Sequence, residues 1–405
     1  MRIGIDGSRA FIQQRTGIEE YAYQCIKRLR KKLNSCPVIL YIRPKSNSKI
    51  DFELPNNWKV KVIKFPYFWT QVGLSLEMLF HPVDILFVPA HTLPIIHPKN
   101  SVVVIHGLEY EFCPQAYAWK DKFYMRWTIK KSCQWANKII SVSENTKQDL
   151  IKLYKIPPKK IEVIYEGVSD NFQFSAPNLQ EKSRFKIPNS KFLLFIGRLE
   201  KRKNIEGIIE AFEILKEKYN LPHKLVLVGK KGYKYENIKA QILKSKYKKD
   251  IIEMGYILDK DKRALLKKAS VFLFPSFYEG FGLPILEAQS LGAPVITSNN
   301  SSLREITANN FQFLASNSQL NFDDQTFNRK KEIQSSALLI NPHNPGEIAK
   351  ATWKLISDKN LRDDIIKKGY KNVKRFSWEK CADHLFQHLV PTLSFRAWSG
   401  ISHRK

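Results

Sequence analysis

The sequence predicts an α/β protein made of two doubly wound, Rossmann-like domains that face a central cleft. Short apolar runs alternate with helical patterns through most of the 405 residues, which favours parallel sheets covered by helices. The same alternation starts again after a polar stretch near the middle, and the chain is longer than one ordinary domain. Two such sheets would bind a ligand at the carboxyl ends of their strands.

The first domain is expected to span residues 1–175. Helical spacing predicts amphipathic helices over Glu19–Leu33 and Asn145–Leu153. Its predicted strands are short apolar runs: Ile3–Ile5, Val38–Ile42, Val60–Ile63, Ile85–Val88, Val102–Ile105, Ile139–Val142 and Ile161–Ile164.

The second domain is expected over residues 176–375, followed by a closing helix within 376–392 that carries Trp378 and Leu389. The run from Ile205 to Leu215 has helical spacing, and a helix is predicted over Pro284–Leu291. The predicted strands are Phe192–Ile196, Leu225–Val228, Val271–Phe274 and Val295–Thr297.

Three polar segments interrupt this regular pattern. Ser169–Ser183 has little periodicity and is interpreted as the interdomain linker. Residues 308–334 are interpreted as an irregular insertion in the second domain, because structureless stretches of that length are unusual in compact domains. Residues 393–405 are expected to be a tail without packing partners.

Charge and cysteine content restrict the environment more than the function. Sixty-seven Lys and Arg against 38 Asp and Glu give a net charge of +29, which attracts polyanions of any kind. A general excess of basic residues in the composition, on solvated helix faces, explains this net charge as well as a specific anionic partner does. Five scattered cysteines favour reduced thiols in the cytoplasm over disulfides or a zinc site. The N-terminus runs directly into a predicted strand, and no apolar run approaches the roughly 20 residues of a spanning helix, so membrane contact is expected to be peripheral.

The densest chemical pattern follows the predicted strand that ends at Phe274. A loop with two glycines precedes Pro284, which suits the first turn of a helix. Glycines let backbone amides approach a sugar or an anion, and the helix N-terminus adds positive potential. Glu279 and Glu287 suit hydrogen bonds to the diols of a sugar and a ribose. The alternative is an ordinary turn with one solvated glutamate and one glutamate stabilised by the helix dipole.

A second basic loop, Gly197-Arg198-Leu199-Glu200-Lys201-Arg202-Lys203-Asn204, also lies between a strand and a helix. Arg198 offers a fork for phosphate oxygens and Lys203 a compact charge, so the two residues would clamp a diphosphate. The alternative is a basic loop on a protein that is basic throughout.

These strings, in this order, resemble the retaining glycosyltransferases of family 4, which have the GT-B fold. Glu279 to Glu287 matches the family's E-x7-E motif with the Glu-Gly-Phe-Gly-Leu-Pro core, and Gly197-Arg198…Lys203-Asn204 matches its diphosphate-binding turn. Other matching strings are Ser141–Glu144, Ile164–Val168, Gly255–Ile257, Leu291–Ile296 and Phe376–Trp378. The resemblance covers nearly the whole chain.

The resemblance implies a role for each matching residue. Arg198 and Lys203 would neutralise the leaving nucleoside diphosphate, and Gly17 would let a loop approach it. Glu279 would contact the donor sugar, and His106 would lie near the anomeric carbon, so both are the expected catalytic residues. The remaining donor-binding residues would be Tyr256 and Ile257 for the base, Phe281, Gly282 and Leu283 for sugar and phosphate, and Glu287 for the ribose.

Two features depart from the family or imitate another. Many relatives have His-Asp-Leu where this chain has His106-Gly107-Leu108, so a polar contact near the acceptor is expected to be absent; His106 alone also fits a satisfied core histidine. Asp259-Lys260-Asp261 imitates a metal-binding Asp-x-Asp, but it precedes a predicted helix over Ala264–Ala269, where capping explains it.

The expected activity is metal-independent retaining transfer of a hexose, with mannose favoured, from a nucleotide-diphosphate sugar to a lipid- or glycan-linked acceptor. The resemblance points to bacterial surface polysaccharide or lipopolysaccharide synthesis, with GDP-mannose as the favoured co-substrate and no other cofactor. Basic residues on the first helix (Lys27, Arg28, Arg30, Lys31 and Lys32) would rest on the anionic inner face of the membrane, unless they form an ordinary solvated face. The alternatives are a nucleotide-sugar epimerase of the same fold, an inactive transferase, and a nucleic-acid-binding protein, for which no basic and aromatic motif is present.

Overall fold

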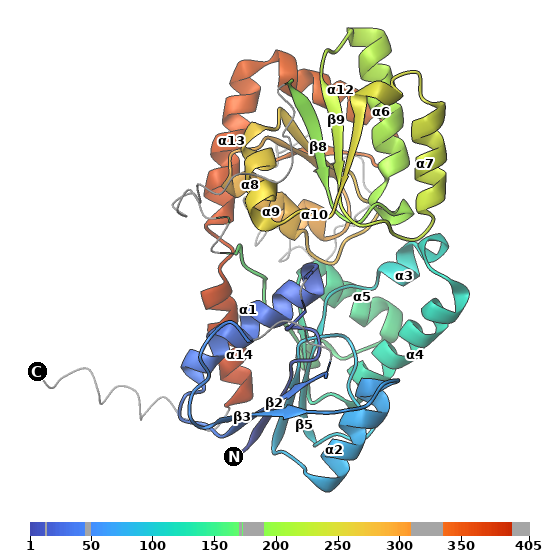
Figure 1. The fold of residues 1–405 in the computed structure, drawn as a ribbon. Helices are drawn as coiled ribbons and strands as arrows, with labels where there is room; N and C mark the ends of the chain where they lie inside the picture. The colour runs from blue at the N-terminus through green and yellow to red at the C-terminus, as the bar shows by residue number, and fades with distance from the viewer. Residues whose placement is uncertain (13, 45–49, 170–171, 173–189, 309–334, 391–405) are drawn as a thin grey trace, which may run out of the picture. The chain divides into compact units, whose positions relative to one another are not determined.

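The protein forms two compact units, which the computed structural model describes for residues 1–12, 14–44, 50–169, 172, 190–308 and 335–390 (Figure 1). The first unit comprises Met1–His106, Phe123–Gly167 and the chain from Ser377 onward. The second comprises Gly107–Lys122 and Val168–Phe376. The expected boundaries lie after residues 175 and 375; the short segment 107–122 is interposed in the first unit's sequence but packs with the second unit.

The first unit is built on a parallel sheet with the strand order β3-β2-β1-β4-β5-β6-β7 among the described residues. The strands are β1 (Ile3–Asp6), β2 (Val38–Ile42), β3 (Trp58–Val62), β4 (Ile85–Val88), β5 (Asn100–Ile105), β6 (Lys138–Ser141) and β7 (Ile161–Val163). β1 and β4 are buried along their whole length, as apolar strands in a parallel sheet covered on both faces must be.

The first unit's helices are α1 (Gly17–Lys32), α2 (Ser75–Phe80), α4 (Trp119–Trp135), α5 (Glu144–Tyr154) and α14 (Trp378–Leu389); a π-helical turn, η1 (Trp69–Leu74), leads into α2. The expected closing helix is α14, and it packs on α1 through Trp378, whose ring lies 5.6 Å from that of Tyr21. Gly167 is required at this junction, because a Cβ there would lie 2.0 Å from the Trp378 nitrogen.

The second unit repeats the architecture with the order β10-β9-β8-β11-β12-β13. Its strands are β8 (Phe192–Ile196), β9 (Lys224–Val228), β10 (Ile251–Gly255), β11 (Val271–Phe274), β12 (Val295–Ser298) and β13 (Leu338–Ile340). Its helices are α3 (Glu109–Phe112), α6 (Ile205–Tyr219), α7 (Tyr235–Lys244), α8 (Asp259–Lys268), α9 (Leu283–Ser290), α10 (Ser301–Thr307), α12 (Pro345–Ser357) and α13 (Lys359–Val373). The prediction of two doubly wound α/β sheets is confirmed.

Details differ from the sequence-based expectations. The predicted strands are all present, with ends shifted by a few residues, and α9 starts and ends one residue earlier than predicted. Helix α8 begins at Asp259, so Asp259 and Asp261 lie in its first turn instead of capping it from outside, and the N-cap position is Leu258. The linker Ser169–Ser183 lies mostly outside the described residues; so do all but residue 308 of the expected insertion and the whole expected tail.

The strand orders determine where a ligand can bind in each unit. In the second sheet the order reverses between the neighbouring strands β8 and β11, and in the first sheet between β1 and β4. Open α/β sheets bind ligands beyond the carboxyl ends of the strands at such a reversal. The loops after β8 and β11 are the two in which the sequence places its charged motifs.

Candidate active site

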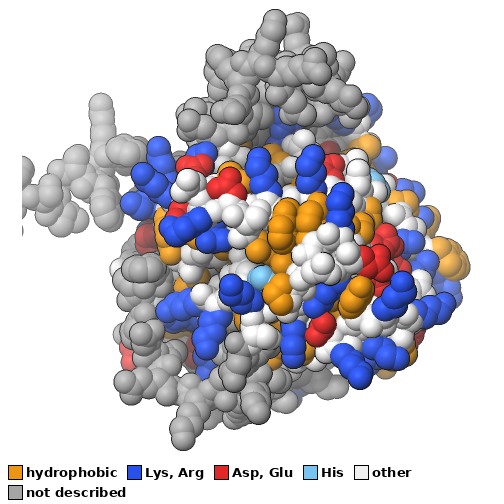
Figure 2. Space-filling view, turned by 90° about the horizontal axis from the view of Figure 1, so that it is seen from above, with side chains coloured by type: hydrophobic (Ala, Val, Ile, Leu, Met, Phe, Trp, Pro, Cys, Tyr) orange, Lys and Arg blue, Asp and Glu red, His pale blue; other side chains and the backbone are white. Residues whose placement is uncertain are grey.

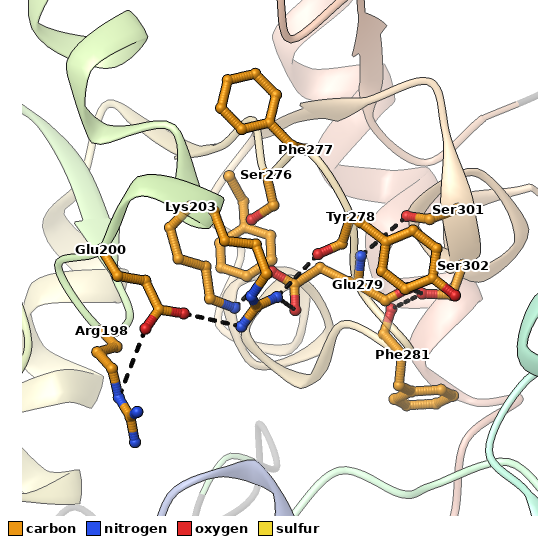
Figure 3. A network of polar contacts seen from close by, with 12 residues as sticks. Arg198, Glu200, Lys203, Ser276, Phe277, Tyr278, Glu279, Phe281, Ser301 and Ser302 are labelled. Carbon is orange, nitrogen blue, oxygen red and sulfur yellow. Dashed lines mark hydrogen bonds and ion pairs between the residues drawn. The ribbon is translucent and has the colours of Figure 1, made fainter. Parts of the chain in front are cut away.

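A buried ion-pair network joins the two charged loops of the second unit (Figure 3). Glu279 is 7% exposed and receives two cations from the loop after β8. Arg202 Nη1 lies 3.0 Å from its Oε2, and Lys203 Nζ binds its Oε1. Arg202 also donates to the carbonyl oxygen of Tyr278 at 2.8 Å, so it holds the backbone of the glutamate loop as well as its charge.

The electrostatics of Glu279 are dominated by these neighbours. Burial favours the neutral acid, yet Arg202 and Lys203 together lower the pKa of Glu279 to about 2. Burial and the Arg202 charge lower the pKa of Lys203, although Glu279 opposes this. Glu279 is therefore a carboxylate at neutral pH, and it compensates two cations that would otherwise be costly to bury.

Arg198 occupies the exposed end of the same network. Its side chain is 53% exposed, and its Nε lies 3.9 Å from Glu200, whose other oxygen is 3.0 Å from Arg202. With Arg202 and Lys203 compensated by Glu279, the guanidinium of Arg198 is the cation of this network that solvent reaches most easily.

Two serine side chains from the start of α10 hold the backbone of the loop that carries Glu279. The Glu279 amide donates to Ser301 Oγ at 3.2 Å, and Ser302 Oγ donates to the Glu279 carbonyl at 2.8 Å (Figure 3). Gly282 has φ +139°, a conformation that favours glycine, and is the N-cap of α9. Leu283 and Pro284 then start the helix, so the first amides of α9 point beyond its N-terminus next to the network.

The other predicted donor-binding residues lie in the same unit. Glu287 is 9% exposed on α9 and forms an ion pair with Lys262 of α8. Ile257 is buried just after β10, and Tyr256 beside it faces the ammonium of Lys230, 5.0 Å from the ring centroid. Phe281 is buried against Phe376. The structure thus places Arg198, Lys203, Glu279 and Glu287 on loops and helices that follow β8 and β11; their roles stay predictions.

His106 and Gly17, the two predicted site residues of the first unit, have different surroundings. His106 ends β5 and is 7% exposed. Its Nε2 lies 2.9 Å from the Pro89 carbonyl, which only accepts, so Nε2 carries a hydrogen. Nδ1 lies 3.3 Å from Glu166, and burial raises the pKa of Glu166, although the contact with His106 opposes this. Both ring nitrogens are occupied, as in the core-histidine alternative.

Gly17 begins α1 in open surroundings. A Cβ at Gly17 would meet nothing within 4 Å. The preceding Thr16 amide donates to Glu19 Oε2 at 3.1 Å, and Glu19 lies 3.3 Å from Arg9. The N-terminus of α1 is therefore accessible, but the carboxylate of Glu19 already offsets the positive end of the helix dipole.

The sequence analysis missed Arg202 and Glu109. Arg202 was one of several basic residues in its loop, and only its contact with Glu279 distinguishes it. Gly107 has φ +151°, and a Cβ there would lie 2.9 Å from Glu109 Oε1 and 3.0 Å from Gly280 Cα. Burial raises the pKa of Glu109, opposed by Arg202. A carboxyl group is therefore present beside Gly107, supplied by Glu109.

Among the described residues, no group of three or more His, Cys, Asp or Glu side chains is arranged to hold a metal ion. Asp261 of the Asp-x-Asp imitation is 1% exposed, and neither of its carboxylate oxygens has a hydrogen-bond partner in the described part of the chain. Asp261 lies within a helix that belongs to the sheet's covering layer.

Two family models match consecutive parts of the chain. Residues 15–172 match Glycosyltransferase Family 4, and residues 178–372 match Glycosyl transferases group 1. The O-antigen chain mannosyltransferase B of Escherichia coli is 28% identical over 70% of this chain and 68% of its own.

Solved structures share the fold at low identity. Sucrose-phosphate synthase from Thermosynechococcus elongatus superposes with a TM-score of 0.71 at 17% identity, covering 95% of this chain and 97% of the other. HepE from Anabaena, solved in complex with UDP-glucose, has a TM-score of 0.68 at 15% identity, covering 96% of this chain and 100% of the other. These likenesses confirm the predicted two-domain fold.

Proposed function

Because this chain belongs to the family 4-like glycosyltransferases of the GT-B fold, we propose that it transfers a hexose, with mannose favoured, from a nucleoside diphosphate to a lipid- or glycan-linked acceptor. The proposed pathway class is bacterial surface polysaccharide or lipopolysaccharide synthesis. The proposed location is the cytoplasm, at the inner face of the membrane.

The observation that carries this proposal is the network of Arg198, Arg202 and Lys203 around Glu279 at the strand-order reversal of the second sheet. Cations and helix-end amides at one point stabilise a diphosphate that gains charge as the glycosidic bond to phosphate breaks. The arrangement needs no side-chain nucleophile. Glu287, on α9, supplies a carboxylate of the kind that binds a ribose diol.

Charge compensation within the network suggests how a donor would be recognised. A diphosphate would compete with Glu200 for the guanidinium of Arg198. The first amides of α9 would then bind the diphosphate oxygens that Arg198 does not bind. Glu279, held as a carboxylate, would accept hydrogen bonds from sugar hydroxyls. In this proposal the leaving phosphate is neutralised by protein cations, and transfer proceeds without a metal ion and with retention of anomeric configuration.

Mannose as the transferred sugar is supported by the similarity to the O-antigen chain mannosyltransferase of Escherichia coli. GDP-mannose is therefore the donor we propose first, and UDP-glucose, the ligand in the HepE structure, is the natural comparison.

A donor panel tests the proposal. GDP-mannose, UDP-glucose and UDP-N-acetylglucosamine are each incubated with the chain and a glycolipid acceptor mixture, with and without a chelator, and products are identified by mass spectrometry and by the anomeric coupling in NMR. We expect a mannosylated product of retained configuration from GDP-mannose, unaffected by the chelator. Glu287→Ala should reduce the rate about a hundredfold or more.

Other outcomes would point to the alternatives. Conversion of a nucleotide sugar to its epimer without any acceptor would indicate an epimerase. Donor binding without turnover would indicate an inactive transferase, and tight, salt-dependent binding of RNA without donor binding would indicate a polyanion-binding protein. Loss of transfer in the chelator would contradict metal independence alone.

A further inference from the structure

The first unit carries an unusual concentration of exposed apolar side chains, which we call the aromatic face. In the stretch from residue 67 to 80, Tyr67, Phe68 and Phe80 are 77%, 67% and 70% exposed. On α4, Phe123 is 70% exposed. The full set of its exposed apolar residues is Tyr67, Phe68, Val72, Leu76, Leu79, Phe80, Ile95, Ile96, Phe123, Tyr124 and Trp127. Large exposed apolar groups that gather in one region mark an interaction surface.

Hydrogen bonds show that these segments pack against one another in the first unit. The loop of Leu93 to Ile96 is bonded to η1 and α2 on one side, since Gln71 donates to the Leu93 carbonyl at 3.1 Å and the Ile96 amide donates to Ser75 Oγ at 3.3 Å. On the other side the Leu93 amide donates to Ser132 Oγ of α4 at 2.9 Å. Figure 1 accordingly shows α2 and α4 side by side.

The charge on this face is predominantly positive, although Asp121 in the first turn of α4 is an exposed acid beside it. The segments 59–81, 93–99 and 123–135 contain Lys64, Lys99, Arg126 and Lys130, all exposed. The acidic residue within these segments is Glu77, which is 9% exposed and lies 2.7 Å from Lys61. Figure 2 shows the protein from above, where Lys and Arg side chains lie among Asp and Glu side chains. The net charge alone therefore does not distinguish this face, but the absence of exposed acids from these described segments does.

We propose that the aromatic face docks this protein on a bilayer that contains anionic phospholipid. Aromatic side chains with interspersed Lys and Arg suit the headgroup region, where rings enter the interface and ammonium groups meet phosphates. A second copy of the chain is a poorer occupant, because two cationic faces repel each other. The inference deepens the proposed function, since a lipid-linked acceptor lies at such a surface.

This placement differs from the one expected on α1. Arg28 and Lys32 of that helix pair with Glu379 of α14 at 3.5 and 2.9 Å, and Lys32 also binds Asp383. Those two basic side chains serve packing within the first unit, so the membrane contact is better assigned to the aromatic face.

Vesicle flotation tests the proposal with the full chain and no sugar donor, so its failure and the failure of the transferase proposal are separate. The probes are vesicles of phosphatidylcholine alone and of phosphatidylcholine with phosphatidylglycerol. We expect binding to the anionic vesicles only, weakening as salt rises. Phe123→Ala/Trp127→Ala, at helix positions that alanine suits, should weaken binding at least tenfold. Arg126→Gln/Lys130→Gln should weaken it about tenfold or more.

Matched controls separate the face from general charge and hydrophobicity. Lys367→Gln/Lys371→Gln removes two exposed cations at the same helical spacing on α13, and Leu153→Ala/Leu243→Ala removes two exposed apolar side chains elsewhere. Both controls should bind within about twofold of the wild type, since they leave the docking surface intact. Wild type that ignores anionic vesicles, or controls that lose as much binding as the face variants, would overturn the proposal. A wild-type dimer that becomes monomeric in Phe123→Ala/Trp127→Ala, without vesicle binding, would assign the face to self-association instead.

Discussion

The carboxyl ends of the two sheets carry different chemistry. In the second unit, the loops after β8 and β11 meet in a network of Arg198, Arg202 and Lys203 with carboxylates. In the first unit, the end of β5 carries His106 among Glu166 and aromatic rings, with Tyr21 4.6 Å and His91 5.3 Å from its ring. Burial lowers the pKa of His91 well below its ordinary value.

The difference shows that the charged groups of the site are already in position in the second unit before a ligand binds. The second unit keeps ionised groups buried by pairing them, and such a network stabilises a ligand's charge without reorganising. At the end of β5 in the first unit, His106 and Glu166 are instead buried beside each other with hydrogen-bond partners, as in a packed core. We infer that the charged groups for donor binding are in place in the second unit, whereas the end of β5 is packed as a core.

Glu279→Gln should have the largest effect on stability. The substitution leaves Lys203 buried without the carboxylate it binds and leaves Arg202 with Glu200 alone, and breaking a buried ion pair costs about 3–5 kcal/mol. Urea unfolding followed by circular dichroism measures the loss. If the midpoint stays at the wild-type value, the network is not what holds the two loops together.

The stability that Glu279 provides should vanish in acid. Its pKa is lowered to about 2 in the folded protein from 4.5, so its contribution of about 3 kcal/mol is complete above pH 4.5 and is lost as the pH falls toward 2. The free energies of unfolding of the wild type and Glu279→Gln should converge over this window. A difference that stays constant with pH would mean that the Glu279 charge contributes nothing.

Gly107→Ala should cost about 1–3 kcal/mol, because φ +151° is strained for alanine and the new Cβ would press on Glu109 and Gly280. Gly17→Ala is the matched control: it begins a helix in open space and should be neutral or stabilising by up to about 1 kcal/mol. Thermal unfolding of the two variants measures both. Equal midpoints would show that the backbone at Gly107 relaxes freely.

Glu166→Gln should have the smallest effect, about 1 kcal/mol or less. We expect Glu166 to donate one hydrogen bond to His106 Nδ1, and the glutamine amide can donate the same bond. The comparison with Glu279→Gln in the same unfolding assay is the informative result. A cost near that of Glu279→Gln would mean that His106 and Glu166 form a true ion pair, and the contrast between the units would fail.

Much of the fold was predictable from the sequence, because strand and helix periodicities are local. Phe192–Ile196 is a strand with the predicted bounds, and the closing helix was expected from Trp378 to Leu389. The loops holding Glu279 and Glu287 were identified because glycine and proline mark a strand-loop-helix turn.

The pairings within the site were not predictable. Four basic residues follow Gly197 within six positions, and their spacing does not reveal that Arg202, with Lys203, reaches Glu279 while Arg198 stays exposed. Phe112 stacks on Tyr278 with ring centroids 4.4 Å apart, although 166 residues separate them, since segment 107–122 packs with the second unit. Such contacts depend on tertiary packing, which periodicity does not encode.

The most direct test of the central claim is calorimetric titration of GDP and UDP into the wild type, Arg198→Ala and Lys201→Ala. Lys201 is the matched control, a cation of the same loop that lines a separate hollow of about 780 Å³ with Glu206 and Glu210. We predict that one nucleoside diphosphate binds, that Arg198→Ala weakens its binding about thirtyfold or more, and that Lys201→Ala changes it less than about threefold. Equal losses in both variants, or no binding to the folded wild type, would contradict a diphosphate site built on Arg198.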